Sequence, residues 1–211
     1  MPAPDTKPVR RKRMPRAERE RQMLAVAEEV FAERGYVAAS MDEIAERVGV
    51  SKPMLYEYFG SKEGLLVGAI RESRAELRAV TERAIDGVTD ADEALRKGIM
   101  AFFDFITEHR QAWSLLRNES TLLAGSTAAE IEATRQQQTD LMITLFGHYL
   151  PNATPSEHEA TAEIVVGACE RLAIWCERRQ DITPRQATEH IMRSLWYGLR
   201  DTSATELEVR H

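Results

Sequence analysis

Side chains suited to a phosphodiester backbone and to base edges follow one another between residues 40 and 62. The set combines hydroxyls, lysine ammonium groups and compact apolar groups, and its members are Ser40, Ser51, Lys52, Pro53, Met54, Tyr56, Tyr58 and Lys62. Hydroxyl and ammonium groups donate to phosphate oxygens, a lysine can also donate to guanine O6 and N7, and an apolar group can contact a thymine methyl. This segment therefore predicts binding to double-stranded DNA.

Two short helices joined by a tight turn would position these side chains. Ser40 and Glu43 have the spacing of a capping box, in which each side chain accepts a hydrogen bond from the backbone N–H of the other. Gly49 suits the turn, because glycine adopts positive φ without a Cβ clash. We expect Ser51 to cap the second helix, with Pro53 in its first turn. The pattern predicts a helix-turn-helix.

Apolar spacing predicts which faces of these helices are buried. The inner face of the first helix comprises Met41, Ile44, Ala45 and Val48, and that of the second comprises Leu55 and Phe59. The outward residues of the second helix are then Lys52, Met54, Tyr56, Glu57 and Tyr58. Glu57 can accept from cytosine N4 or point into solvent, and the two tyrosines can contact phosphates or cover the helix packing.

The order Gly-Val-Ser, Leu-Tyr-x-Tyr-Phe and Ser-Lys-Glu-x-Leu resembles the DNA-binding domain of the tetracycline-repressor (TetR) family of bacterial transcription regulators. The resemblance covers roughly residues 18 to 66, and the rest of the chain carries no recognisable motif. It implies that the helix after the turn enters the major groove. It also implies phosphate contacts by Ser40, Ser51, Tyr56, Tyr58 and Lys62, with Lys52, Pro53 and Met54 nearest the base edges.

Charge and composition limit the class of protein. Of the 211 residues, 43% are hydrophobic and 29% are charged, which indicates a soluble globular protein. We expect a cytoplasmic protein, since no apolar run of about 18 residues and no secretory signal is found. The net charge of −6 is uneven, because residues 1–62 hold 12 Lys and Arg against 10 Asp and Glu. A proline-rich basic arm, residues 1–15, is expected to be disordered, and it either contacts DNA or acts as a solubilising tail.

The two cysteines do not indicate a disulfide or a metal site. Cys169 and Cys176 are seven residues apart in an apolar helical stretch, so their Cα atoms lie about 10 Å apart, beyond the reach of a disulfide. No histidine has ligand spacing with either cysteine. We expect both to be buried small apolar residues, and we expect no metal and no cofactor.

The whole chain reads as all-α. We expect a three-helix DNA-binding domain at 16–62 and a helical ligand-binding and dimerisation domain at 63–211. In the second domain, a first helix is expected from Ser61 to about Ile85, and a second starts at Asp90, where Glu93 completes a capping box. Further helices are expected over 111–124, 128–149, 155–179 and 184–200, with residues 125–127 interrupting the helical pattern. The last two begin with Thr154-Pro155 and Thr183-Pro184 and are expected to pack as an antiparallel pair. The resemblance implies that the first helix joins the DNA-binding domain to the regulatory one.

Apolar and polarisable side chains in this second domain suit a hydrophobic or aromatic effector. The candidates for lining a ligand pocket are Met100, Phe103, Trp113, Leu116, Met142, Phe146 and Trp175. Each of these residues could equally be part of an ordinary core, and Arg117, Glu119 and His148 are weaker polar candidates.

The last two helices are also the expected homodimer surface. Small and apolar residues on them allow close approach of a second copy, namely Ile164, Gly167, Ala168, Leu172, Ile191, Leu195, Trp196 and Leu199. Two copies would read two half-sites, as a palindromic operator requires, whereas in a monomer these residues would only close the core.

The sequence therefore favours a ligand-responsive, sequence-specific transcriptional regulator, a repressor that a small hydrophobic molecule releases from a palindromic operator. One alternative is a DNA-binding activator or co-regulator whose helical body binds a protein or no ligand. An enzyme is the remote alternative, because the chain has no nucleophile elbow, no phosphate-binding glycine loop and no HExxH motif.

Overall fold

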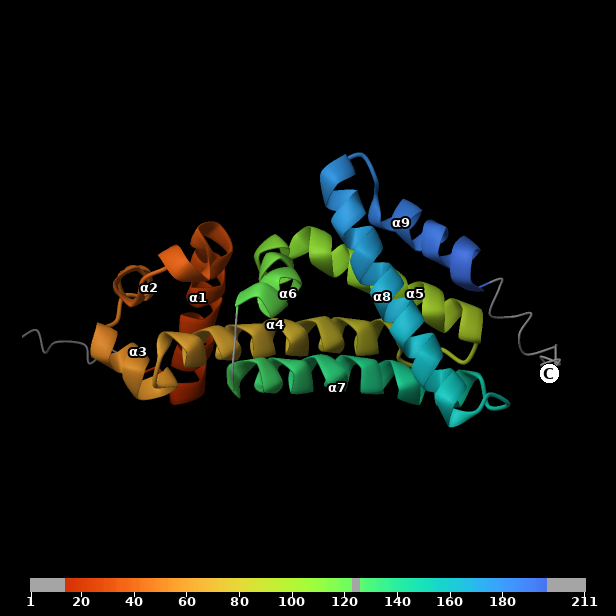
Figure 1. Ribbon diagram of the computed structural model, residues 1–211, viewed down its shortest axis with the longest axis horizontal. Coiled ribbons are helices and arrows are strands. Elements are labelled where there is room, and N and C mark those ends of the chain that lie inside the picture. Colours follow the sequence, from red (N-terminus) through yellow and green to blue (C-terminus); the bar gives the residue numbers. More distant parts are fainter. Residues whose placement is uncertain (1–13, 123–125, 197–211) are drawn as a thin grey trace, which may run out of the picture.

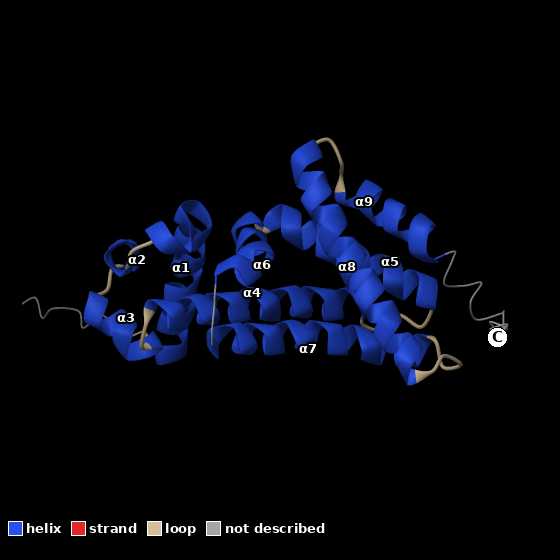
Figure 2. Ribbon diagram, in the orientation of Figure 1, coloured by secondary structure: helices blue, strands red, loops and turns tan. Residues whose placement is uncertain are grey.

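The computed structural model describes residues 14–122 and 126–196, and in these ranges every regular element is helical (Figures 1 and 2). The elements are α1 (Arg16–Ala38), α2 (Met41–Val48), α3 (Lys52–Phe59), α4 (Lys62–Ile85), α5 (Ala91–Glu108), α6 (Arg110–Leu122), α7 (Ser126–Tyr149), α8 (Pro155–Arg179), α9 (Pro184–Ile191) and a π-helical turn (Met192–Trp196). The all-α prediction is confirmed. The basic arm lies outside the described residues, apart from its last two.

The helix α4 connects the two parts of the molecule. In Figure 1, α1, α2 and α3 gather at one end, and α4 runs from that end along the body beside α7. We call α1–α3 the head and the remaining helices the body. The first turns of α4 pack against α1 and α3, and the helix also packs against α5, α6 and α7. A single helix therefore contacts both parts.

The core of the head has the composition that its spacing predicts. All four inner residues of α2 are buried, Leu55 of α3 is fully buried, and Phe59 is only half-buried. They pack with Met23, Ala27, Val30 and Phe31 of α1 and with Leu65 and Leu66 of α4. Burial of this single apolar cluster fixes the angle between α2 and α3.

The predicted N-terminal caps of the head form only in part. The Glu43 N–H donates to Ser40 Oγ at 3.1 Å, but the Glu43 carboxylate accepts from Arg47 at 2.7 Å and from Arg34 at 3.4 Å instead of returning to the cap. Ser51 precedes α3 in an extended conformation, and its side chain makes no capping hydrogen bond. A charged partner competes better than a backbone N–H for a carboxylate, which accounts for the open box at α2.

The body shows both outcomes for the same motif. At α5 the Glu93 N–H donates to Asp90 at 2.9 Å, but the Glu93 side chain pairs with Lys97. Complete capping boxes start α8 and α9, where they are formed by Thr154 with Glu157 and by Thr183 with Gln186. The proline-led starts predicted for these two helices are confirmed.

Two glycines set turns in the head. Gly49 adopts φ 78° at the end of α2, as the predicted turn requires. Gly35 adopts φ 73° and ψ 161° inside α1, a conformation that residues with a Cβ avoid. The last turn of α1 is therefore displaced from the axis of the rest, and this break was not predicted.

Several boundaries in the body differ from the prediction. Ser126 and Thr127 start α7 instead of breaking the chain, while Gly125 lies outside the described residues. The final helix ends at Ile191 and passes into the π-helical turn, and α9 packs chiefly against α5 instead of pairing only with α8 (Figure 1). None of the described helices has the length and hydropathy needed to cross a membrane.

Candidate nucleic-acid interface and internal cavity

The outer face of α3 is open to solvent. Ser51, Lys52, Pro53, Met54 and Tyr56 are all exposed, while Leu55 points into the core with no exposed surface. The fold therefore places the three predicted base-reading positions together on the first turn of α3, with the Tyr56 side chain one turn further along. Glu57 is also exposed, which leaves both of its predicted roles open.

Lys52 is not free in this structure. Its Nζ lies 2.9 Å from Asp42 Oδ2, with 44% of the Lys52 side chain and 72% of the Asp42 side chain exposed. The hydrogen bond to Asp42 raises the pKa of Lys52, so the ammonium remains charged. The pair joins the first turns of α2 and α3, and Lys52 has to leave Asp42 before it can donate to a base edge.

Tyr58 and Lys62 are held by intramolecular contacts. The Tyr58 ring is half-buried, packs 6.0 Å from the Phe59 ring and has the Arg16 guanidinium 4.9 Å from its centroid. Lys62 Nζ donates to the Val37 carbonyl at 3.3 Å and lies 4.6 Å from the centre of the Tyr36 ring. Tyr58 is therefore less outward than its position in the pattern suggested.

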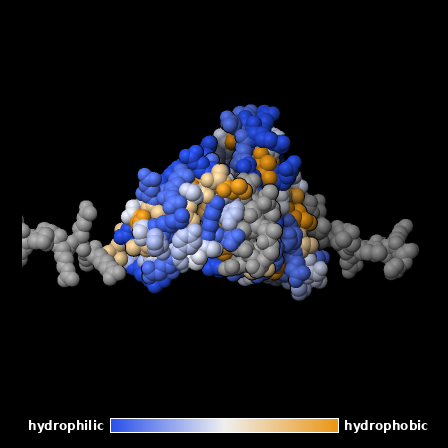
Figure 3. Space-filling view, turned by 60° about the vertical axis from the view of Figure 1, so that its left-hand side comes forward, coloured by the Kyte–Doolittle hydropathy of each residue, from blue (hydrophilic) through white to orange (hydrophobic). Residues whose placement is uncertain are grey.

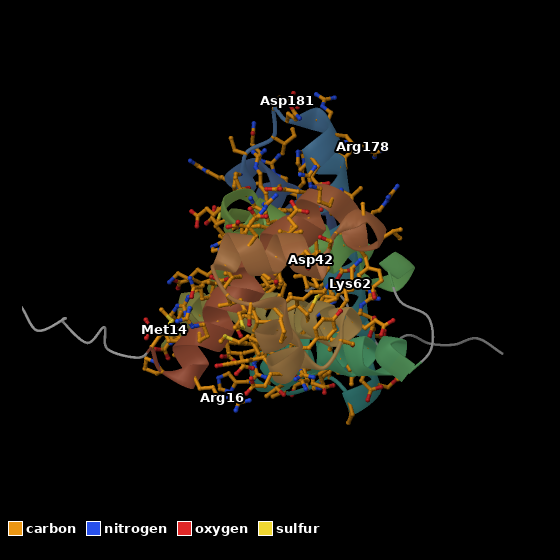
Figure 4. The ribbon with its side chains drawn as sticks, turned by 90° about the vertical axis from the view of Figure 1, so that its left-hand side faces the viewer. Met14, Arg16, Asp42, Lys62, Arg178 and Asp181 are labelled. Atoms are coloured by element: carbon orange, nitrogen blue, oxygen red, sulfur yellow. The ribbon has the colours of Figure 1, made fainter. Side chains whose placement is uncertain are left out.

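Two further residues belong to this end of the molecule. Figure 4 shows Asp42 and Lys62 near the middle of the head and Arg16 at its edge. Val37 is almost completely exposed beside Lys62, because the turn at Gly35 directs the end of α1 outward. Val37 was not predicted, and the signal for it was the glycine two residues before it.

An ion-pair network fixes α2 against α1. Arg47 Nη2 lies 2.8 Å from Glu33 and 2.7 Å from Glu43. The hydrogen bond from Arg47 lowers the pKa of Glu33, and the two carboxylates raise the pKa of Arg47. The network holds α2, the first helix of the helix-turn-helix, at a defined angle to α1.

Polar contacts join α1 to α4 across the boundary between head and body, and α4 to the start of α6 within the body. Ser73 Oγ on α4 donates to the Glu28 carboxylate on α1, and His109 at the start of α6 lies 3.6 Å from Glu76 on α4. Burial raises the pKa of Glu28, since desolvation disfavours the carboxylate. The joint between α1, α4 and α6 is therefore partly polar.

A cavity of about 260 Å³ lies in the body. Its wall draws on α4 to α8 and on the π-helical turn, and the apolar part includes Leu77, Ile85, Leu95, Ile99, Phe102, Trp113, Leu116, Met142, Leu145, Phe146, Val165, Ile174 and Trp196. Four of the seven predicted pocket residues are among these, namely Trp113, Leu116, Met142 and Phe146.

The other three predicted pocket residues do not line the cavity. Phe103 is buried in the core on the other side of α5. Met100 Sδ accepts from Thr188 Oγ1 at 3.7 Å, and Trp175 packs against His190 and Arg179. All three are apolar helix positions, and sequence spacing does not distinguish one buried side of a helix from another.

The cavity wall also carries polar groups. Arg74, Arg117, Arg135 and Glu170 line it, with Arg117 paired to Glu177 and Arg135 3.3 Å from Glu170. Among the described residues, three buried side-chain nitrogen or oxygen atoms have no hydrogen-bond partner, and they are Trp113 Nε1, Trp196 Nε1 and Gln138 Oε1. All three belong to cavity-lining residues.

Residues proposed for a dimer surface divide into three groups. Ile164 is 52% exposed, Gly167 is exposed, and Ala168, Leu172 and Leu195 are half-buried. Ile191 and Trp196 are buried in the core of the protomer, so they are not available on its surface. Leu199 lies outside the described residues. On the face shown in Figure 3, exposed hydrophobic side chains form separate patches among hydrophilic ones.

Both cysteines are free. Cys169 is buried in the cavity wall, where desolvation raises the pKa of its thiol to about 12, and Cys176 is half-buried. Cys169 therefore agrees with the interpretation as a small apolar residue. In the part of the chain that the structure describes, no cluster of His, Cys, Asp or Glu could hold a metal ion.

Known proteins resemble the chain in sequence and in fold. Residues 23–69 match the profile of the bacterial regulatory proteins of the tetR family, and residues 91–198 match that of the tetracyclin repressor-like C-terminal domain. The HTH-type transcriptional activator FasR of Mycolicibacterium smegmatis is 32% identical over 193 residues, which cover 92% of this chain and 88% of FasR.

Two solved structures extend the comparison. A TetR-like transcriptional regulator from Rhodococcus sp. RHA1 aligns with a TM-score of 0.70 at 31% identity, over 89% of this chain and 99% of that one. FadR from Bacillus subtilis in complex with stearoyl-CoA aligns with a TM-score of 0.74 at 18% identity, over 82% and 95% of the two chains. At 18% identity the second likeness concerns the fold alone.

Proposed function

This chain belongs to the TetR family of DNA-binding transcriptional regulators, and on that premise we propose that it binds a two-fold symmetric operator as a cytoplasmic homodimer and leaves it when an apolar effector fills the cavity. One observation carries the proposal. The helix α4 begins beside α3 and then forms part of the cavity wall through Leu77, Thr81 and Ile85.

The DNA contacts follow from the open face of the head. We assign Ser40, Ser51, Tyr56, Tyr58 and Lys62 to phosphates, and Lys52, Pro53 and Met54 to base edges. The support is that Ser51, Tyr56 and the three base-reading positions are exposed on or beside α3. Tyr58 and Lys62 would exchange their contacts with Arg16 and Tyr36 for phosphate oxygens, which accept charge-assisted hydrogen bonds.

The length of α4 converts a small change at the cavity into a larger one at the DNA. With 24 residues at about 1.5 Å each, the helix spans about 36 Å. A tilt of about 5° about its cavity end then moves the head by about 3 Å, and the two heads of a dimer by up to twice that. Half-sites one DNA turn apart tolerate little change in the spacing of the two recognition helices.

The effector has to bind the DNA-incompetent spacing more tightly than the competent one, because equal affinity for both would shift nothing. The wall is largely apolar, and FadR, which shares the fold, is described in complex with stearoyl-CoA. We propose that the effector is an acyl thioester or a molecule of similar chemistry. A cavity of about 260 Å³ accommodates apolar acyl carbons, and the coenzyme A moiety would remain outside.

The effect on transcription follows from the position of the operator. A dimer that overlaps a promoter represses, and one bound upstream can recruit polymerase; FasR, the relative at 32% identity, is described as an activator. We propose that this chain is a repressor, with activation as the alternative. Release of DNA by the effector is the same physical step in both cases.

Selection of bound DNA from a random pool tests the DNA part of the proposal. The expected product is a pair of inverted half-sites with a fixed spacing. On that operator, Tyr56→Phe and Lys62→Ala should weaken binding about equally across sequences, because phosphate contacts carry no sequence information. A single asymmetric site, or unchanged affinity in both variants, would remove the assignment.

Titration with stearoyl-CoA tests the effector part. Fluorescence polarisation of labelled operator should fall as stearoyl-CoA is added and should not change with free coenzyme A. The same ligand should raise the melting temperature of the free protein, since a ligand that binds the folded state stabilises it. Stabilisation without release of DNA would show binding that is not coupled to the head.

A further inference from the structure

We propose that the indole N–H groups of Trp113 and Trp196 donate to a carbonyl oxygen of the effector, so that the cavity selects an apolar molecule with an uncharged acceptor over a plain hydrocarbon chain. The inference rests on the proposed function and goes beyond it, since it names the groups that recognise the ligand and the ligand atom that they recognise.

Neither indole N–H has an acceptor in the part of the chain that the structure describes. Trp113 is 4% exposed and Trp196 is 6% exposed, both line the cavity, and neither Nε1 has a hydrogen-bond partner among the described residues. Buried N–H groups are almost always paired, because an unpaired one loses its hydration without compensation. Because no described residue supplies an acceptor to these two donors in one wall, we assign the acceptor to the effector.

Packing fixes the direction of at least one donor. The Trp113 ring meets the Phe102 ring edge to face, with the centroids 5.8 Å apart and the planes at 88°. A large indole in a packed wall cannot turn to find another partner without displacing its neighbours. The acceptor therefore has to come to the N–H.

The other polar groups of the wall favour an uncharged acceptor. Arg117 and Arg135 are already paired with Glu177 and Glu170, and Arg74, the third arginine of the wall, also has an interaction within the chain. A ligand carboxylate beside the indoles would be buried without a new counter-charge, which is costly, whereas a carbonyl oxygen needs only the N–H donors. The Gln138 side chain, with its Oε1 unpaired, can serve as acceptor or, with the amide reversed, as a further donor.

A matched pair of ligands tests the inference on the full-length protein. S-dodecanoyl-N-acetylcysteamine has a thioester carbonyl, and S-dodecyl-N-acetylcysteamine is the same molecule with a methylene in its place. Titration calorimetry should show the thioester binding about 5- to 100-fold tighter, the ratio for two hydrogen bonds between uncharged groups.

Isosteric replacement then locates the donors. In 3-benzothienylalanine a sulfur atom replaces the indole N–H with little change of shape. At position 113 or 196 the replacement should reduce the preference for the thioester. It should also raise the melting temperature of the ligand-free protein, because an unpaired buried donor is removed. Trp175 is the matched control, since it lies outside the cavity against His190 and Arg179, and its replacement should change neither quantity.

The outcomes separate this inference from the proposed function. If both ligands bind with equal affinity and release the operator, the effector class stands and the carbonyl site is wrong. If neither ligand binds, both proposals fail. A preference that persists in the two replaced proteins, or a lower melting temperature on replacement, would show that the N–H groups already have a partner and would overturn the inference.

Discussion

Replacing Asp42 by Asn should tighten binding to the operator. In the structure the Asp42 carboxylate holds the Lys52 ammonium at 2.9 Å, at the first turn of the helix that we propose to face DNA. If Lys52 reads a base, every binding event has to break this pair and leave Asp42 near the phosphates. Asparagine keeps the size of the side chain and removes the charge.

The exposure of the pair sets the size of the effect. With 72% of the Asp42 side chain and 44% of the Lys52 side chain exposed, solvent and salt screen most of the attraction. Exposed ion pairs change an equilibrium constant by a factor of about 1.5 to 5. A dimer breaks two pairs for each operator, so the affinity should rise about 2- to 25-fold, with the larger gain at low salt.

Polarisation titrations of the selected operator at several salt concentrations measure the change. Asp181→Asn is the matched control, because Asp181 forms a 2.9 Å exposed pair with Arg179 at the far end of α8, away from the head (Figure 4). Equal gains in both variants would mean that net charge alone acts. Weaker binding by Asp42→Asn would mean that the pair positions α3 and persists on DNA. Lys52→Ala should then relax the preference at no base of the half-site.

Three further predictions concern the fold and the assembly. Gly64→Ala should destabilise the protein by about 1–3 kcal/mol in chemical denaturation, because the new Cβ would lie 2.2 Å from the Phe59 carbonyl oxygen. In the control Gly147→Ala the new Cβ would have no atom nearer than 3.9 Å, so this variant should be more stable by about 0.5–1 kcal/mol. Destabilisation of equal size in both variants would refute the clash. Ile164→Asp should convert the proposed homodimer to a monomer in sedimentation analysis, with the melting temperature of the folded chain retained, and a persistent dimer would place the interface elsewhere. Burial raises the pKa of Glu28, so the stability contributed by its protonated form is present at low pH and is lost as the pH rises. Glu28→Gln should therefore raise the melting temperature more at pH 8 than at pH 5. An equal change at both pH values would contradict the raised pKa.

The head was predictable because its signals are local. The turn at Gly49, the buried face of α2 and the exposed first turn of α3 each depend on residues that are close together in the sequence, no further apart than the length of one short helix. Spacing along the chain is then enough to assign each side chain to a face. The capping boxes at Thr154 and Thr183 belong to the same class.

The contacts between elements were not predictable in the same way. The Asp42–Lys52 pair, the Lys62 ammonium on the Tyr36 ring and the Arg16 guanidinium on Tyr58 all join residues from different helices. Each pair affects a predicted DNA contact, because the DNA-binding side chain would first have to leave its intramolecular partner. The residue types indicated which side chains could bind DNA, but only the packing of the helices showed which intramolecular partners compete with DNA for them.

The cavity is the extreme case of this difference. The residues of its wall are spread along the sequence from Arg74 to Trp196, so the cavity depends on how five helices and a final π-helical turn pack together. A pattern of apolar residues on one helix shows that a side is buried, but it cannot show whether the neighbour is another side chain or a space. Phe103 and Trp113 illustrate the point, since both are buried and apolar, yet Phe103 fills the core and Trp113 faces the space. The property that separates them is hydrogen bonding. A buried indole N–H that has no acceptor among the described residues indicates a place for a ligand atom, whereas a phenyl ring has no donor that could give this indication. In an all-helical regulator, unpaired donors are therefore a more specific indication of a ligand site than apolarity.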